Sequence, residues 1–219
     1  ERNAQWDRDN FIAKGNGIAK SKDDIKATLT IDWDNHKSIS TNLMGIFFED
    51  ISYAADGGLY AELIQNRDFE YSPSDHKGWN PNTAWRLEGH GTEWTIATSD
   101  PIHQNNPHYS VLSTSAPGAR LINDGWDGIV LKKGEKYDLS LFTRGQGSVK
   151  VSLVDEKGNI LAVTTFKATA KWQRSKTTVT PKASATKASL VIEPMQKGSI
   201  DLDFVSLLPR STFRGRQNG

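Results

Sequence analysis

The chain has 219 residues, of which 36% are hydrophobic and 24% are charged, so it can bury an ordinary core and is not predicted to be disordered. Its 27 basic and 26 acidic side chains leave a net charge of +1, without the basic excess of proteins that bind nucleic acid. No apolar run approaches the roughly 20 residues that a membrane helix needs. The absence of cysteine excludes disulfides and thiolate catalysis. Neither nucleic acid nor a membrane is therefore an expected partner.

The N-terminal part of the chain predicts a leader and two strands. Residues 1–26 are polar and charged and do not resemble a signal peptide. Residues 27–33 alternate polar and apolar side chains, as a half-buried strand does. Residues 43–48 form a continuous apolar run, which indicates a strand buried on both faces, as in a parallel sheet.

A helix is expected directly after this buried strand. Leu59, Leu63 and Asn66 fall at helical spacing, with Ala61 as a good helix former between them. A buried strand that runs into a helix is how a β/α unit begins. We therefore assign residues 27–65 to an N-terminal strand and the first β/α element of a barrel.

Residues 66–209 have the pattern of an all-β domain. Short alternating segments are separated by turns rich in Gly, Asn and Asp, and no helical periodicity of useful length interrupts them. The predicted strands are 93–97, 108–114, 128–132, 137–143, 148–154, 160–166, 176–180, 188–193 and 200–207. This series predicts a mainly β protein with a jelly-roll β-sandwich.

The last segment, residues 210–219, is a short basic tail without a closing strand. A (β/α)8 barrel needs about 250 residues, so a complete barrel does not fit in this chain. We therefore expect the sandwich to be inserted after the first β/α element of an incomplete barrel, with residues 210–219 as the return segment toward the missing part.

Two carboxylates, Glu49 and Asp50, directly follow the predicted buried strand. In enzymes with a (β/α)8 barrel, the C-terminal ends of the strands line the active site. Glu49 is therefore a candidate acceptor of hydrogen bonds from substrate hydroxyls. The alternative is that both acids are loop carboxylates or helix caps.

Residues 39–51 and 56–70, together with residues 213–219, resemble the corresponding segments of α-L-arabinofuranosidases of glycoside hydrolase family 51. The resemblance implies a retaining enzyme that removes terminal arabinofuranosyl residues from arabinan or arabinoxylan of plant cell walls. It also implies that Glu49 binds the furanose. The two catalytic glutamates of that family come from later barrel strands, so no catalytic residue is expected in this chain, which alone should be inactive. The full-length protein is expected to be secreted or periplasmic, and its assembly into a homo-oligomer stays open.

A second resemblance covers most of the sandwich. Residues 66–70, 78–79, 127–145 and 200–207 resemble carbohydrate-binding modules of the family 4/9 type. In many such modules a structural calcium ties the first strand to the last, and the resemblance places Glu70 and Asp203 at its carboxylate ligands. The alternative is two surface acids at strand ends. No cofactor for catalysis is expected.

Seven tryptophans are many for this length. Flat aromatic rings stack on sugar faces, and Trp126, in a turn rich in Gly and Asp, is the candidate substrate-binding residue of the sandwich. A tryptophan in a β-sandwich can also belong to the core.

Two other functions of the chain remain open: a stand-alone carbohydrate-binding module, and a purely structural insert that shapes the cleft of the barrel.

Overall fold

The computed structural model describes residues 28–32, 34–40, 42–43, 45, 47–49, 51 and 53–218. The chain divides into two units, Glu1–Phe47 and Phe48–Gly219. In the first unit the described residues are exposed and belong to no helix or strand. The strand predicted over residues 27–33 is therefore wrong for residues 28–32. The alternating pattern is present, but a strand also needs a neighbouring strand for its backbone hydrogen bonds.

The buried strand predicted over residues 43–48 is also wrong where the structure describes it. Leu43, Gly45, Phe47 and Phe48 are exposed and lie outside any strand, with Phe47 85% exposed. Met44 and Ile46 lie outside the described residues. A strand buried on both faces requires covering layers, and the described residues supply none for this segment.

The helix predicted over residues 59–66 is replaced by a turn and an extended segment. Asp56 and Tyr60 form an isolated bridge. The Ala61 N–H donates to Asn218 O at 2.9 Å, and the Leu63 N–H donates to Leu207 O at 3.1 Å. These contacts with the end of the chain take the place of intrahelical hydrogen bonds, so tertiary partners override the local helix propensity.

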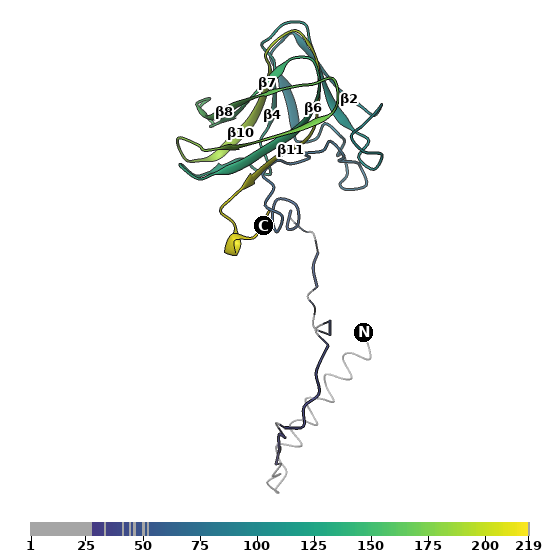
Figure 1. The fold of residues 1–219 in the computed structure, drawn as a ribbon, viewed down its shortest axis with the longest axis vertical. Helices are drawn as coiled ribbons and strands as arrows, with labels where there is room; N and C mark the ends of the chain where they lie inside the picture. The colour runs from purple at the N-terminus through teal and green to yellow at the C-terminus, as the bar shows by residue number, and fades with distance from the viewer. Residues whose placement is uncertain are drawn as a thin grey trace, which may run out of the picture. The chain divides into compact units, whose positions relative to one another are not determined.

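The second unit is an antiparallel β-sandwich, which confirms the predicted fold class (Figure 1). Its strands are β1 (Trp85–Glu88), β2 (Thr92–Ala97), β3 (Tyr109–Thr114), β4 (Arg120–Asn123), β5 (Ile129–Leu131), β6 (Tyr137–Gly145), β7 (Ser148–Val154), β8 (Ile160–Lys167), β9 (Gln173–Val179), β10 (Ala185–Pro194) and β11 (Gly198–Pro209). A 3-10 turn, η1, follows at Phe213–Gly215. Among the described residues, no helix is long and apolar enough to cross a membrane.

The strands form two sheets. The first has the order β1-β4-β10-β7-β8, with β5 paired to β10, and the second has the order β2-β3-β11-β6-β9. All nine segments predicted as strands in the sandwich are strands, whereas β1 and β4 were not predicted. The jelly-roll connectivity, the insertion into a barrel and the division of the chain at residues 26, 65 and 209 stay predictions.

The core lies between the two sheets and follows from alternation along the strands. In β6, Leu139 and Leu141 are buried, whereas Asp138 and Phe142 are only partly buried. In β7, Val149 and Val151 are buried, whereas Lys150 between them is only partly buried. Each sheet therefore presents one apolar face inward, as in other β-sandwiches. In the second sheet, the pairing of β11 with β6 has an irregularity between Asp203 and Ser206.

Candidate functional site

Aromatic and acidic side chains from three separate loops surround a hollow of about 640 Å³ at one end of the sandwich. Residues 53–56 form one wall, the loop of residues 71–79 before β1 forms a second, and the turn between β4 and β5 supplies the third. The lining residues are Tyr53, Asp56, Tyr71, Asp75, His76, Trp79 and Trp126.

The rings in this aromatic hollow are close to parallel. Tyr71 and Trp79 stack with their centroids 4.2 Å apart and their planes within 3°, and Tyr53 lies 6.5 Å from Trp79 at an interplanar angle of 7°. Trp126 contacts Tyr53 at 4.6 Å in a tilted arrangement. Parallel rings with polar edges present flat apolar surfaces of the size of a sugar ring, with hydrogen-bonding groups beside them.

A buried asparagine fixes the loop that carries Trp79. The side-chain amide of Asn66 donates to Pro81 O at 2.9 Å and to Thr83 O at 2.8 Å, and its Oδ1 accepts the Tyr71 N–H at 3.2 Å. These three bonds tie both ends of the loop to one residue that is 1% exposed. The stack is therefore largely formed before any ligand arrives, which lowers the entropic cost of binding.

The polar groups of the hollow can both donate and accept hydrogen bonds. Burial raises the pKa of Tyr71 to about 12, so its hydroxyl stays protonated at neutral pH and keeps its capacity to donate. Asp75 accepts the Ser72 N–H at 2.8 Å on Oδ2, which leaves Oδ1 of the same exposed carboxylate for a ligand. Such a mixture suits hydroxyl-rich ligands, because each hydroxyl can act in either role.

Trp126, predicted from the sequence to bind sugar, lies in this hollow. Its indole N–H donates to Glu62 O at 2.8 Å, which holds one edge of the ring against the protein. Gly57, with φ +85°, packs on the indole so closely that a Cβ atom there would lie 2.3 Å from Cε2. The position of Trp126 therefore depends on a glycine at residue 57.

Replacing Gly57 by alanine is expected to displace Trp126 from the hollow. The new methyl group would overlap the indole, and alanine also disfavours a positive φ by about 1 kcal/mol. We expect a loss of about 1–2 kcal/mol in the free energy of unfolding and a red shift of tryptophan fluorescence. Gly158→Ala is the matched control for the backbone effect alone, because Gly158 has φ +84° and open space around its Cβ position. An equal fluorescence shift in both variants would contradict the packing argument.

The other predicted residues lie elsewhere. Glu49 is exposed, is in no regular element and does not line the hollow. Glu70 and Asp203 lie on either side of one loop: Glu70 accepts the His108 N–H at 2.8 Å, and Asp203 accepts the Asn106 amide at 3.0 Å. Because both acids accept hydrogen bonds from the loop of residues 106–108, their carboxylates lie close enough for the charge of Glu70 to act on Asp203.

Asp203 is fully buried and has a strongly perturbed acidity. Burial raises its pKa to about 8, and the neighbouring carboxylates of Asp68 and Glu70 add to that rise. Burial also raises the pKa of Asp68. Within the part of the chain that the structure describes, no three His, Asp or Glu side chains are arranged to hold a metal by themselves.

The sequence predicted Trp126 as a sugar-binding residue, but it did not predict the other aromatic residues that line the hollow with it. Tyr53, Tyr71 and Trp79 are far apart from Trp126 in the chain, so their proximity follows only from the loops that the sandwich brings together. The available signal was local: Tyr71, His76 and Trp79 place three rings within nine residues of a loop rich in Pro, Asp and Gly.

Comparisons with known proteins give the chain its relatives. Residues 61–198 match the family model described as "Carbohydrate binding domain". An extracellular exo-α-L-arabinofuranosidase of Streptomyces chartreusis is 35% identical over 83% of this chain and 22% of its own length. α-L-Arabinofuranosidase 1 of Arabidopsis thaliana is 29% identical over 94% of this chain and 33% of its own.

The solved structures agree with this result. An arabinose-bound α-L-arabinofuranosidase of glycoside hydrolase family 51 is 28% identical, with a TM-score of 0.66 over 78% of this chain and 30% of its own. The chain thus spans between about a fifth and a third of the length of these relatives. By its family match and its sandwich, the chain belongs to the carbohydrate binding domain family of the 4/9 type.

Proposed function

We propose that this chain is the carbohydrate-binding portion of a longer α-L-arabinofuranosidase, and that the aromatic hollow is its saccharide site. The observation that carries the proposal is the parallel stack of Tyr71 and Trp79 beside Trp126, in a domain of the carbohydrate binding family. A sugar ring would lie against the aromatic faces, while Asp75 and the Tyr71 hydroxyl would hydrogen-bond its hydroxyls.

The whole protein would remove terminal α-L-arabinofuranosyl residues from arabinan or arabinoxylan with retention of configuration. Retaining hydrolysis needs two carboxyl groups about 5 Å apart across the scissile bond. We place both outside this chain, in further barrel strands, with Glu49 as a furanose-binding residue once its barrel neighbours are present. The extracellular Streptomyces relative supports a secreted location for the whole protein, and a periplasmic location stays the alternative.

Affinity electrophoresis tests the binding part of this proposal. The chain is run through gels that contain arabinan, arabinoxylan or xylan, with a non-binding protein as mobility reference. Retardation by an arabinose-containing polymer, and not by xylan, is the expected result and would identify the polymer. Unchanged mobility in every gel would contradict sugar binding and favour a structural insert.

An activity assay tests the catalytic part separately. The chain alone is expected to release no arabinose from 4-nitrophenyl α-L-arabinofuranoside, whereas the full-length protein is expected to release it. Turnover by the 219-residue chain itself would show that the catalytic pair lies within it and would overturn this assignment.

We also propose that calcium binds at the cluster of Glu70 and Asp203. The donor chemistry fits a hard cation, because the carboxylates of Asp68 and Glu70 raise the pKa of the buried Asp203, and a positive charge beside them would stabilise its ionised form. Since too few acidic side chains converge there to hold an ion alone, backbone carbonyls or the amide oxygen of Asn106 would complete the ligand set. A bound calcium would fix the loop of residues 106–108 against β11.

The pH dependence of stability distinguishes the metal-free chain from the calcium-bound chain. The pKa of Asp203 is about 8 in the folded chain and about 3.9 when unfolded. The folded chain therefore binds more protons between these values, so in chelator the free energy of unfolding falls from about pH 4 to pH 8, by at most about 1.4 kcal/mol per pH unit. Calcium is expected to cancel this fall, because it binds the ionised carboxylates.

Thermal unfolding between pH 4 and pH 8, with calcium and with chelator, measures this effect. Asp203→Asn is expected to remove both the pH-dependent fall and the stabilisation by calcium, whereas Asp127→Asn, at an exposed position, is expected to leave both unchanged. Identical unfolding curves with calcium and chelator at pH 8 would exclude the metal site.

A further inference from the structure

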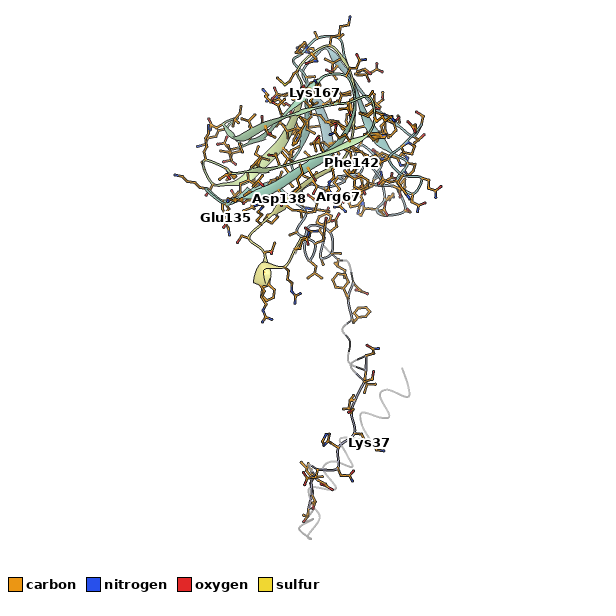
Figure 2. The ribbon with its side chains drawn as sticks, viewed as in Figure 1. Lys37, Arg67, Glu135, Asp138, Phe142 and Lys167 are labelled. Atoms are coloured by element: carbon orange, nitrogen blue, oxygen red, sulfur yellow. The ribbon has the colours of Figure 1, made fainter. Side chains whose placement is uncertain are left out.

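A second cavity, of about 520 Å³, lies on the outer face of the five-stranded sheet. Its lining residues differ from those of the aromatic hollow. Strands β6, β9 and β11 form its floor, and Tyr60, Gln217 and Asn218 form part of its wall. Three cations, Arg67, Arg174 and Lys176, line it, against a single acid, Asp138. We call it the cationic groove. Figure 2 shows Arg67, Asp138 and Phe142 on the same side of the sandwich.

The acid in the cationic groove is already neutralised. Asp138 Oδ2 lies 3.1 Å from Lys176 Nζ, and its Oδ1 lies 2.8 Å from Arg210 Nε. The pKa of Asp138 is lowered by these hydrogen bonds, although its partial burial acts in the opposite direction. Asp138 therefore cannot also neutralise the two arginines of the groove.

The two arginines are poorly compensated. Arg174 is exposed, and its Nη2 donates one long hydrogen bond of 3.4 Å to Ser140 Oγ; among the described residues it makes no ion pair. Arg67 Nη1 donates to Tyr60 Oη at 2.9 Å and lies 3.5 Å from Glu62 Oε2. The Glu62 carboxylate also accepts hydrogen bonds from Ser206 Oγ and from two backbone N–H groups, so Arg67 shares this acid with three other donors.

An apolar surface lies between these cations. The irregularity in β11 gives Phe204 a φ of +45°, and its ring lies 6.0 Å from the ring of Phe142 on β6. The Val205 N–H donates to Arg67 O at 2.9 Å, so the same irregularity also fixes the arginine segment beside the sheet. The groove thus combines an apolar floor, made of two rings inclined at 58° to each other, with guanidinium groups at its side.

From this combination we propose that the cationic groove binds a sugar residue that carries a carboxylate, that is, a hexuronic acid. Its ring would lie over Phe142 and Phe204, and its carboxylate would accept paired hydrogen bonds from Arg174 and the free edge of Arg67. A planar guanidinium matches a carboxylate with two parallel hydrogen bonds. The proposal extends the saccharide-binding function to a second site, with acidic in place of neutral sugars.

Calorimetric titration of the whole chain with tri-galacturonate tests this proposal, with the uncharged galactotriose as the matched probe. Tri-galacturonate is expected to bind at least tenfold more tightly than galactotriose, and to weaken as NaCl rises from 50 to 300 mM. Arg174→Gln is expected to reduce the affinity for tri-galacturonate at least tenfold. Lys167→Gln, an equal charge change at an exposed position on β8, is expected to have no effect.

Several outcomes would overturn the proposal: equal affinity for both trisaccharides, an equal loss in Arg174→Gln and Lys167→Gln, or full competition by acetate at the concentration of the trisaccharide. Arg174 makes one weak contact, so its variant is expected to fold, and circular dichroism checks this. Trp79→Ala separates the two sites, because it should leave tri-galacturonate binding intact. If that variant loses neutral polymer binding while tri-galacturonate never binds, the aromatic hollow stands and the cationic groove fails.

Discussion

Replacing Glu62 by alanine is expected to lower the free energy of unfolding by about 3–5 kcal/mol, the largest effect of any single change considered for this fold. The carboxylate is fully buried and accepts three hydrogen bonds: from Ser206 Oγ at 2.6 Å, from the Leu207 N–H at 2.8 Å and from the Ile64 N–H at 3.1 Å. Alanine would leave all three donors buried without an acceptor, at about 1–3 kcal/mol each before any relaxation.

Glu62 also supports the aromatic hollow indirectly. Its backbone carbonyl accepts the Trp126 indole N–H, so movement of the Glu62 segment would displace Trp126 as well. Chemical denaturation of Glu62→Ala measures the loss. The control is Glu88→Ala, which removes a carboxylate paired with Arg86 and Arg120 at the surface and should cost less than about 1 kcal/mol. Similar losses in the free energy of unfolding for both variants would contradict the role of Glu62 in holding residues 61–64 against β11.

Replacing Trp79 by alanine is expected to weaken polysaccharide binding by about 30-fold, equivalent to about 2 kcal/mol. Trp79 stacks on Tyr71, lies parallel to Tyr53 and also contacts the ring of His76 at 5.1 Å. Its removal deletes the central platform, whereas Asn66 still holds both ends of the loop. The fold should therefore be retained while the affinity falls.

Phe213→Ala is the matched control for Trp79→Ala. Phe213 is an exposed aromatic residue, 67% accessible, and lies outside the aromatic hollow. Affinity electrophoresis and thermal unfolding of both variants compare binding with stability. If Phe213→Ala loses as much affinity as Trp79→Ala, or if Trp79→Ala binds like the unchanged chain, the hollow is not the saccharide site.

The sandwich was largely predictable from the sequence because apolar residues recur at every second position along most of its strands. β7, for example, has the bounds predicted from the alternation of Val149, Val151 and Leu153. β1 and β4 were missed because each has only four residues with two apolar side chains, too few to show an alternating pattern. These strands are defined by their pairing with each other, which a local pattern does not contain.

Residues 59–66 and the aromatic hollow were less predictable from the sequence, because their contacts come from distant parts of the chain. The helix expected around Leu63 has the right spacing, but Leu207 and Asn218, more than 140 residues later, provide its backbone partners instead. The aromatic hollow likewise depends on three loops that meet only in the folded chain. Trp126 could be proposed from its turn, whereas the stacking of Tyr71 on Trp79 required the structure.

Tryptophan indole signals in two-dimensional NMR give the most direct test of the claim that the aromatic hollow binds saccharide. The labelled chain is titrated with arabino-oligosaccharide, with the Trp79, Trp85, Trp94 and Trp126 signals assigned through single substitutions. The Trp79 and Trp126 signals are expected to shift with saturation, while those of Trp85 and Trp94, which donate to Asn66 O and Ser110 Oγ, are expected to stay in place. Saturating shifts elsewhere with Trp79 and Trp126 unmoved, or no shift at all, would contradict the assignment of the hollow.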